Sequence, residues 1–271
     1  MPEGHTLHRM ARLQRRRFVG HALQVSSPQG RFATDAELVD GRVLESVEAH
    51  GKHLFQTFGP DLVVHVHLGL WGRFPNRRLP ADPPRGQVRM RIVGPTHYAD
   101  LRGPSACELL TEVEVKAILA RLGPDPLRRD ADPDEAWARI SRSRAPLATL
   151  LMDQSVIAGV GNVFRAETLF RCGLPPLLPG RDLGRDDWER LWADLRAMMR
   201  DGERRGRIET VTEATLGAGD QPDSACASAV YAYRRTGRPC LVCGTPIARE
   251  SHRARNLFWC PTCQGERPGK H

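Results

Sequence analysis

The sequence contains no apolar run long enough to span a membrane, and its beginning lacks the hydrophobic stretch of a signal peptide. We therefore expect a chain that works in the cytoplasm, without a membrane partner. Lysine is nearly absent as well, since only Lys52, Lys116 and Lys270 stand among the 40 basic residues. Because arginine serves wherever any cation is sufficient, Lys52 is a candidate for a task that arginine performs poorly, such as delivering a proton or a point charge.

Cysteine is scarce, and the seven cysteines are odd in number. This count fits a reducing compartment better than a disulfide framework. Four of the cysteines form two Cys-x-x-Cys pairs with 16 residues between the pairs: Cys240, Cys243, Cys260 and Cys263. Four thiolates at this spacing suit one tetrahedral structural zinc ion, which would fold the segment and leave no open position for chemistry. The isolated Cys107, Cys172 and Cys226 receive no role.

The formal net charge is +8 and the isoelectric point is about 9.5, which favours a polyanionic partner. The charge is uneven along the chain: residues 1–124 carry +5, residues 125–230 carry −3 and residues 231–271 carry +6. We expect these three ranges to be the domains. Two basic regions that flank a near-neutral one suit a nucleic acid gripped from two sides.

The first range indicates a β-rich domain with helices at its ends. Residues 4–18 place apolar side chains at helical intervals, with Thr6 as the expected N-cap. From residue 23 to residue 110, alternating apolar residues and Gly/Pro turns predict an antiparallel sandwich, interrupted by a loop at 76–86. Residues 111–122 are expected to form a short closing helix.

The second range is helical after a proline-rich linker that begins at residue 123. Helices are expected from Pro133 to Ile140, at 147–151 and at 187–199, where the apolar stripe of the last helix is best explained as packed core. Residues 214–229 are small and flexible, and either a substrate lid or plain disorder would produce such a composition. No internal repeat is present in the sequence.

The chain begins with Met1-Pro2-Glu3-Gly4. An initiator methionine is normally removed before a small residue, so that Pro2 would carry a free secondary amine. The pKa of an α-amino group is about 8, and a useful fraction is therefore neutral and nucleophilic at pH 7. Attack of this amine on an aldehyde carbon gives an iminium ion with no N–H proton to lose. Glu3 places a carboxyl group one peptide away, where it can act as acid or base.

Two further motifs point to phosphate. In the run Gln154 to Glu167, the glycines of Gly159-Val-Gly161-Asn162 predict a close turn followed by a helix, and helix N-termini bind phosphate. Asn162 can cap that helix, contact phosphate, or do both. Between the cysteine pairs, Arg249, Arg253 and Arg255 are expected on two short strands and a basic turn that present arginine to phosphate.

Together the motifs resemble the formamidopyrimidine-DNA glycosylase and endonuclease VIII family. The resemblance rests on Pro2-Glu3-Gly4, on Lys52 in Gly51-Lys52-His53-Leu54, on Gly159-Val-Gly161-Asn162 and on the terminal four-cysteine finger, in this order. It covers essentially the whole chain. It implies an α+β fold, with an N-terminal antiparallel β-sandwich flanked by helices, an all-α helix-two-turn-helix domain and a C-terminal zinc finger. It also implies that DNA lies in the cleft between the domains.

The resemblance assigns a role to each candidate residue. Pro2 would attack C1′ of the damaged nucleotide, Glu3 would act as general acid, and Lys52 would contact phosphates and assist elimination. Strand cleavage would follow by loss of the 3′ phosphate and then of the 5′ phosphate, with no organic cofactor. The residues expected to bind DNA are Asn162 and Arg255 at phosphates, and Leu70 and Trp71 as a wedge that fills the hole left by an everted base. Buried core is the alternative for the wedge pair.

The branch of the family rests on few residues. Gly4-His5-Thr6 departs from the Leu-Pro-Glu that is typical of the purine-directed branch, and this favours an endonuclease VIII-like enzyme for oxidised pyrimidines in double-stranded, single-stranded or bubble DNA. The arginine and alanine content suggests a bacterial source, with repair at the nucleoid. A monomer is expected. The alternatives are a same-family enzyme for oxidised purines, a non-catalytic zinc-containing DNA- or RNA-binding protein, and a zinc-ribbon protein that binds no nucleic acid.

Overall fold

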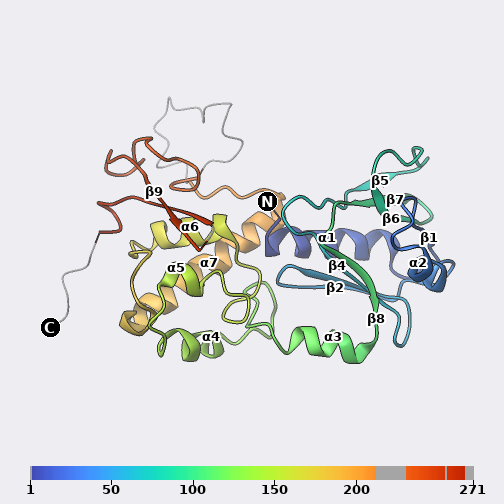
Figure 1. Cartoon of the computed structure of the whole chain (residues 1–271), viewed down its shortest axis with the longest axis horizontal. Coiled ribbons are helices and arrows are strands. Elements are labelled where there is room, and N and C mark those ends of the chain that lie inside the picture. Colours follow the sequence, from blue (N-terminus) through green and yellow to red (C-terminus); the bar gives the residue numbers. More distant parts are fainter. Residues whose placement is uncertain (1, 212–229, 254, 266–271) are drawn as a thin grey trace. The chain divides into compact units, whose positions relative to one another are not determined.

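The computed structural model describes residues 2–211, 230–253 and 255–265, which fall into two compact units, Met1–Leu122 and Gly123–His271 (Figure 1). The segment 214–229, expected to be a flexible loop, lies outside the described residues. The division of the chain at residues 124 and 230 stays a prediction. No helix in the described ranges is long and apolar enough to cross a membrane.

The first unit contains two four-stranded sheets in which every pairing is antiparallel, as the alternating pattern predicted. One sheet has the order β1 (Gln24–Ser26), β6 (Val88–Val93), β7 (His97–Arg102) and β5 (Asn76–Arg78). The other has the order β2 (Ser46–His50), β3 (His53–Thr57), β4 (Val63–His67) and β8 (Ala106–Leu110). The prediction of a loop at 76–86 is wrong for its first three residues, because residues 76–78 form the strand β5, which pairs with β7.

Three helices accompany these sheets: α1 (Gly4–Phe18), α2 (Ala33–Val39) and α3 (Glu112–Leu119). The prediction of α1 is confirmed in its bounds, but Thr6 is not its N-cap. The N-cap is Glu3, three residues before Thr6, and the Thr6 N–H donates to the Glu3 carbonyl at 2.9 Å. The sequence pattern missed α2, which is short and has only two buried residues.

A single apolar core joins both sheets and α1 of the first unit. Leu54 pairs with Ala49 on one side and Val66 on the other, so that all three side chains share the inner face of their sheet. In the same core Leu7 and Phe18 come from α1, which runs between the labelled strands of the two sheets in Figure 1. The helix that begins directly after Glu3 is therefore anchored over its whole length by burial.

The second unit is helical and ends in a hairpin. Its elements are α4 (Pro133–Ile140), α5 (Leu147–Leu150), α6 (Asn162–Arg171), the 3-10 turn η1 (Gly180–Asp182), α7 (Arg185–Arg205), β9 (Ala248–His252) and β10 (Arg255–Trp259). The predicted helices are confirmed, although α7 extends beyond 187–199 at both ends. Its apolar stripe is core, as expected, because Trp188, Leu191 and Leu195 are fully buried.

The hairpin is part of the same body as the helices. Leu257 of β10 is buried in the helical core. The hydroxyl of Thr149 on α5 lies 2.7 Å from Nε2 of His252 on β9, and Nε2 of Gln264 donates to the carbonyl of Leu174 at 3.0 Å. Apolar packing and long-range hydrogen bonds therefore fix the hairpin on the helices.

Candidate functional site

The N-terminal candidates lie at the start of α1. Pro2 is half-buried, and Glu3 is fully buried in an extended conformation (φ −127°, ψ −179°). The Glu3 side chain does not cap the helix. A carboxyl group held at a helix N-terminus interacts favourably with the helix dipole, and burial strengthens that interaction. The geometry therefore gives Glu3 a fixed position directly beside the amine-bearing residue.

Lys52 lies in the two-residue turn that joins β2 to β3. His50 and His53 pair at the end of the hairpin, and Gly51 occupies the first turn position with a φ of +57°. Glycine adopts this left-handed conformation without steric cost, which a tight hairpin turn requires. The lysine is therefore presented from the tip of a rigid hairpin whose strands belong to the sandwich.

A row of histidines beside this turn was missed in the sequence. Nδ1 of His53 lies 2.8 Å from Nε2 of His65, and Nδ1 of His65 lies 2.9 Å from a carboxylate oxygen of Glu108. The carboxylate only accepts, so His65 donates from Nδ1 and His53 donates to Nε2 of His65. The ring of His67 is also close, with its centroid 5.0 Å from that of His53. The alternation His65-Val-His67 in a strand could have revealed that these rings share one face.

Burial keeps these histidines neutral. The pKa of His53 is lowered to about 3, mainly by burial and in part by the neighbouring His65 and His67. Burial also lowers the pKa of His65 despite its contact with Glu108. For His67 burial is again the largest cause of a lowered pKa, and the positive charge of Lys52 contributes. The face next to the lysine therefore carries neutral imidazoles whose orientation is set by hydrogen bonds.

Leu70 and Trp71 lie in a tight turn after β4. The exposed fraction is 48% for the Leu70 side chain and 83% for Trp71, the most exposed large apolar residue in the described part of the chain. Gly69 has a φ of +62°, and a Cβ on Gly72 would lie 2.3 Å from the carbonyl oxygen of Leu68. The turn closes only with these glycines, and it leaves the two apolar side chains outside. The buried-core alternative for this pair is therefore wrong.

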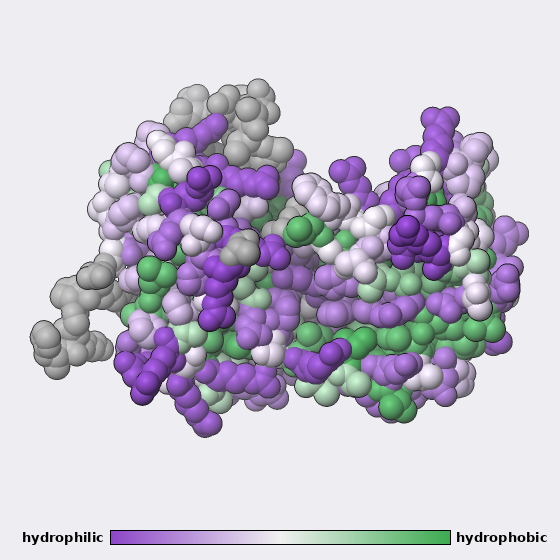
Figure 2. Space-filling view, viewed as in Figure 1, coloured by the Kyte–Doolittle hydropathy of each residue, from purple (hydrophilic) through white to green (hydrophobic). Residues whose placement is uncertain are grey.

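The face of the molecule seen in Figure 2 is mostly hydrophilic, and its hydrophobic areas are broken up by polar residues. Scattered exposed apolar residues are normal on protein surfaces. Two neighbouring large ones in one short turn, with Trp71 almost fully exposed, are less usual. The turn at 70–71 is therefore better suited to insertion into a partner than to packing within the chain.

In the second unit, the turn before α6 is built by Gln154. Its Oε1 accepts from the N–H of Gly159 at 3.0 Å, and its Nε2 donates to the carbonyl of Val160 at 3.0 Å. Gly159 has a φ of +91°, and Gly161 is the N-cap residue of the helix. These contacts explain the glycine pattern, and α6 begins at Asn162 as predicted.

Asn162 does not cap its helix, so that alternative is wrong. The side chain is nearly buried, and its Nδ2 donates to the backbone carbonyl of Asn256 at 3.0 Å. Its Oδ1 accepts a hydrogen bond from the guanidinium of Arg165. Asn256 follows Arg255, the exposed first residue of β10. The structure therefore brings Asn162 next to the backbone of Asn256, beside Arg255. The buried Arg165 contacts both Asn162 and Asn256, and no motif in the sequence pointed to it.

A buried carboxylate holds the chain on both sides of the undescribed segment. Glu167 on α6 is fully buried, and one of its oxygens accepts from the hydroxyl of Thr210 and from the N–H of Tyr231. The other oxygen accepts from the N–H groups of Ala232 and Tyr233, both at 2.9 Å. Four donors therefore satisfy one buried charge and fix the entry to the finger against α6.

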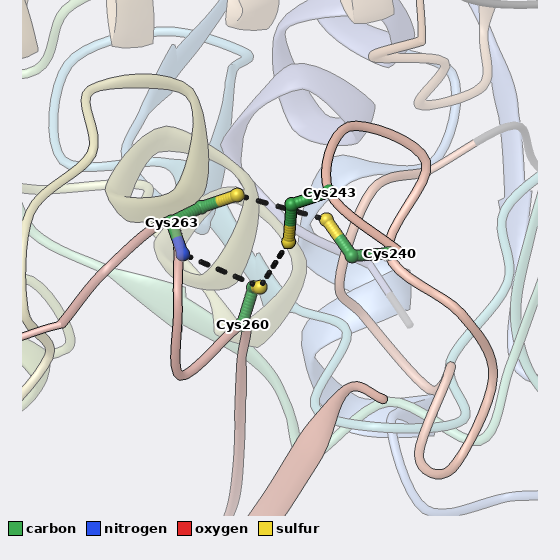
Figure 3. Close-up of side chains that lie close together, drawn as sticks. All are labelled: Cys240, Cys243, Cys260 and Cys263. Atoms are coloured by element: carbon green, nitrogen blue, oxygen red, sulfur yellow. Dashed lines mark hydrogen bonds between the residues drawn. The ribbon is translucent and has the colours of Figure 1, made fainter. Parts of the chain in front are cut away.

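The four expected zinc ligands point toward one another (Figure 3). The sulfur atoms of Cys240, Cys243, Cys260 and Cys263 all lie within 4.8 Å of one another. The Sγ of Cys240 lies 3.8 Å from that of Cys263, and the Sγ atoms of Cys243 and Cys260 are 3.4 Å apart. A tetrahedral zinc ion with Zn–S bonds of about 2.3 Å separates its ligand sulfurs by about 3.8 Å, so the donor set fits this metal.

The surroundings of the sulfurs act in both directions, because burial raises the pKa of Cys260 and of Cys263 while several hydrogen bonds favour a thiolate. Backbone N–H groups of Val242 and Cys263 donate to Cys240 Sγ and Cys260 Sγ, each at 3.4 Å. Hydrogen bonds from Thr245 lower the pKa of Cys243 to about 6. The thiolate, not the thiol, binds metal, and these donors favour it. No other group of three or more potential metal ligands was found among the described residues.

Comparison with known proteins identifies the family of the chain. Three family models match: the formamidopyrimidine-DNA glycosylase N-terminal domain at residues 1–107, the formamidopyrimidine-DNA glycosylase H2TH domain at 122–213, and the zinc finger found in FPG and IleRS at 237–265. The solved structure of Lactococcus lactis Fpg with abasic-site DNA has the same fold, with a TM-score of 0.79 at 20% identity over 97% of this chain and 100% of that one.

Two relatives place the chain more narrowly. It is 52% identical to Endonuclease 8 1 of Mycobacterium bovis over 97% of its own length and 100% of the relative. It is 31% identical to the formamidopyrimidine-DNA glycosylase of Thermus thermophilus over 85% of its length and 86% of that protein. The chain therefore belongs to the formamidopyrimidine-DNA glycosylase and endonuclease VIII family of base-excision DNA glycosylases with abasic-site lyase activity, and the resemblance found in the sequence is confirmed.

Proposed function

We propose that the chain is an endonuclease VIII-like member of this family, a bifunctional enzyme that removes oxidised pyrimidines and cuts the strand. The observation that carries the proposal is the 52% identity with a relative named Endonuclease 8 1, against 31% with one named formamidopyrimidine-DNA glycosylase. Gly4-His5-Thr6 after Pro2-Glu3 points the same way. An enzyme for oxidised purines is the alternative.

Pro2 is the proposed nucleophile. After removal of Met1 its secondary amine attacks C1′ of the everted nucleotide, and the damaged base leaves with the electrons of the glycosidic bond. Glu3 donates a proton to the sugar ring oxygen as the ring opens. Its fixed and buried position directly after Pro2 supports this role. The product of this step is a cationic iminium between the Pro2 nitrogen and C1′.

Elimination then cuts the strand twice. The iminium acidifies C2′, and loss of that proton expels the 3′ phosphate as the β-elimination step. Loss of a second proton, from C4′, expels the 5′ phosphate as the δ-elimination step, and water hydrolyses the remaining iminium ion to free the enzyme. Lys52 at its hairpin tip would contact phosphates near the lesion and assist elimination, which its place on a rigid turn supports.

Four residues are proposed to hold the DNA. Asn162 and Arg255 would donate hydrogen bonds to backbone phosphates, which fixes the register of the duplex without reading its sequence. Leu70 and Trp71 would fill the space left by the everted base. Their exposure in a glycine-closed turn supports this role. The partner is damaged double-stranded DNA, with single-stranded and bubble DNA as further substrates, and the protein acts as a monomer in the bacterial cytoplasm.

The four cysteines are proposed to hold one structural zinc ion. When bound, the ion would order the finger by joining its two cysteine pairs. Four protein ligands leave no position for substrate, so the chemistry is assigned to Pro2, Glu3 and Lys52. An organic cofactor is not part of the proposed reaction.

The test is borohydride trapping. Purified protein is mixed with an oligonucleotide that carries an abasic site, reduced with borohydride, and the adduct is mapped by mass spectrometry. We expect a covalent adduct at Pro2. Pro2→Ala should keep its DNA affinity but lose strand cleavage by at least about a hundredfold, because a primary amine gives an imine that can lose its proton.

An adduct at another residue, or undiminished cleavage by Pro2→Ala, would refute the assigned nucleophile. Tight, salt-sensitive DNA binding without any adduct would favour the non-catalytic DNA-binding alternative. A panel of oxidised pyrimidines and purines, each opposite the four bases, then separates the two branches. Faster release of purine lesions would refute the proposed lesion class.

A further inference from the structure

One buried arginine joins the two elements that carry the proposed phosphate contacts. Only 2% of Arg165 is exposed, and it lies on α6 one turn after Asn162. Its Nη2 donates both to Oδ1 of Asn162 and to the backbone carbonyl of Asn256, the latter at 2.9 Å. Its Nη1 donates to the carbonyl of Ala148 at 3.2 Å. A single guanidinium therefore ties α6, α5 and the start of β10 together.

The guanidinium decides which end of the Asn162 amide faces which partner. A guanidinium can only donate, so the atom that faces it must be the amide oxygen. The nitrogen end is then turned to the carbonyl of Asn256, which accepts one of its two hydrogens at 3.0 Å. The second hydrogen of Nδ2 can donate to a phosphate oxygen. A reversed amide would present its oxygen to the phosphate, and two acceptors repel each other.

The same contacts fix the position of Arg255. The carbonyl of Asn256 accepts from both Asn162 and Arg165, which holds the peptide next to Arg255 against α6. On the neighbouring strand, the contact between Thr149 and His252 holds the residue that pairs with Arg255. The exposed Arg255 side chain therefore starts from backbone that is fixed on both strands.

We propose that Arg165 is a positioning residue for DNA binding, which orients the Asn162 amide as a phosphate donor and sets the place of the hairpin that carries Arg255. This inference rests on the proposed function, in which Asn162 and Arg255 contact the backbone. Arg165 itself touches no DNA in this scheme. Its replacement should weaken binding of DNA while the trapping rate at saturating DNA stays unchanged, because Pro2 and Glu3 belong to the other unit.

The experiment is a double-mutant cycle with Arg165→Met and Asn162→Ala. The affinity for an oligonucleotide with a stable abasic-site analogue is measured at several salt concentrations. Each single variant should bind about tenfold more weakly, as expected for the loss of one hydrogen bond to a charged group. Asn162→Ala should leave the slope of log affinity against log salt near the wild-type value, because a neutral amide on a phosphate releases no counterion. The double variant should bind no more weakly than Arg165→Met alone, because that change already removes the contact made by Asn162.

The matched control is Arg171→Met on the same helix. Arg171 also binds a backbone carbonyl, that of Thr210, and a carboxylate, that of Asp194. Its loss should lower thermal stability but leave the DNA affinity as in the wild type. If Arg165→Met changes stability alone, or if the cycle is additive, Arg165 is a structural residue and the inference is wrong.

Two further outcomes are distinguishable. Wild-type protein that neither binds nor traps abasic DNA would refute the proposed function itself. Normal trapping with unimpaired binding by Asn162→Ala would refute only the phosphate contact and, with it, the role of Arg165. Should Arg165→Met fail to fold or to retain zinc, Arg165→Lys takes its place in the cycle. A lysine keeps the charge but cannot reach all three acceptors, so binding about threefold weaker and again non-additive with Asn162→Ala is expected.

Discussion

The two units hold their candidate residues by different means. In the first unit, Glu3 and Lys52 occupy a helix start and a hairpin tip, and the elements behind them are fixed by an apolar core that spans both sheets. In the second unit, Asn162 is held by the buried Arg165, and the entry to the finger is held by the buried Glu167. In the finger, four cysteine sulfurs lie within 4.8 Å of one another.

This difference has a consequence for mutation. An apolar core tolerates the loss of a side chain at its edge, so function and stability should separate in the first unit. A buried polar group leaves its partners unsatisfied when it is removed, so function and stability should fall together in the second unit. The following predictions test that contrast.

The largest effect is expected at the metal site. Cys260→Ser should lose bound zinc and DNA affinity together, with binding at least about a hundredfold weaker, because the binding free energy of a structural zinc of about 10 kcal/mol or more is also folding free energy of the finger. Zinc content by atomic absorption and DNA affinity by fluorescence anisotropy are the measurements. Cys172→Ser, at a buried cysteine outside the cluster, is the control and should keep its zinc. A metal-free, fully active Cys260 variant would contradict the structural-zinc interpretation.

A smaller effect is expected at the buried carboxylate. Glu167→Gln should lower the free energy of unfolding by about 3 kcal/mol, because the new NH2 group would face donors where an oxygen now accepts from two of them. Guanidinium denaturation followed by tryptophan fluorescence measures this loss. The same change at the exposed Glu189, which pairs with Arg185 on α7, should cost less than about 0.5 kcal/mol. Equal losses at the two positions would show that the buried carboxylate does not carry the stability of the second unit.

The smallest effect is expected at the histidine row of the first unit. The pKa of His53 is lowered to about 3 from 6.5, so the unfolded chain takes up a proton at a higher pH than the folded one. The contribution of neutral His53 to the free energy of unfolding is therefore fully present above pH 6.5. It falls by about 1.4 kcal/mol for each pH unit between pH 6.5 and pH 3. Between pH 7.5 and pH 5.5, His53→Gln should lose about 1.4 kcal/mol less than the wild type. Urea denaturation at both pH values checks this, and equal slopes would show that His53 takes a proton in the folded state.

Much of the local structure could be predicted from the sequence. The bounds of α1, the start of α6 at Asn162 and the closing helix after Thr111 all follow from periodicity and capping within a few residues. Thr111 forms a complete capping box with Glu114. The cap of α1 was misplaced because Thr6 has the right side chain, while the backbone already turns at Glu3. The preference of threonine for the N-cap position was therefore outweighed by burial of the apolar face of the helix, which begins at Gly4.

The candidate residues could also be predicted from short sequence motifs, whereas the residues that surround them could not. The sequence alone identified the four cysteines of the cluster, because two Cys-x-x-Cys pairs at this spacing are typical of a zinc site. Only the tertiary structure decided that Leu70 and Trp71 are exposed, and that Arg165 links Asn162 to a carbonyl 94 residues away from Asn162. Only the tertiary structure likewise showed that the carboxylate of Glu167 accepts from three backbone N–H groups that lie 64 to 66 residues further along the chain. The physical reason is range: dihedral preferences and ligand spacing act between neighbours, whereas the partner of a buried polar group is set by how distant segments pack.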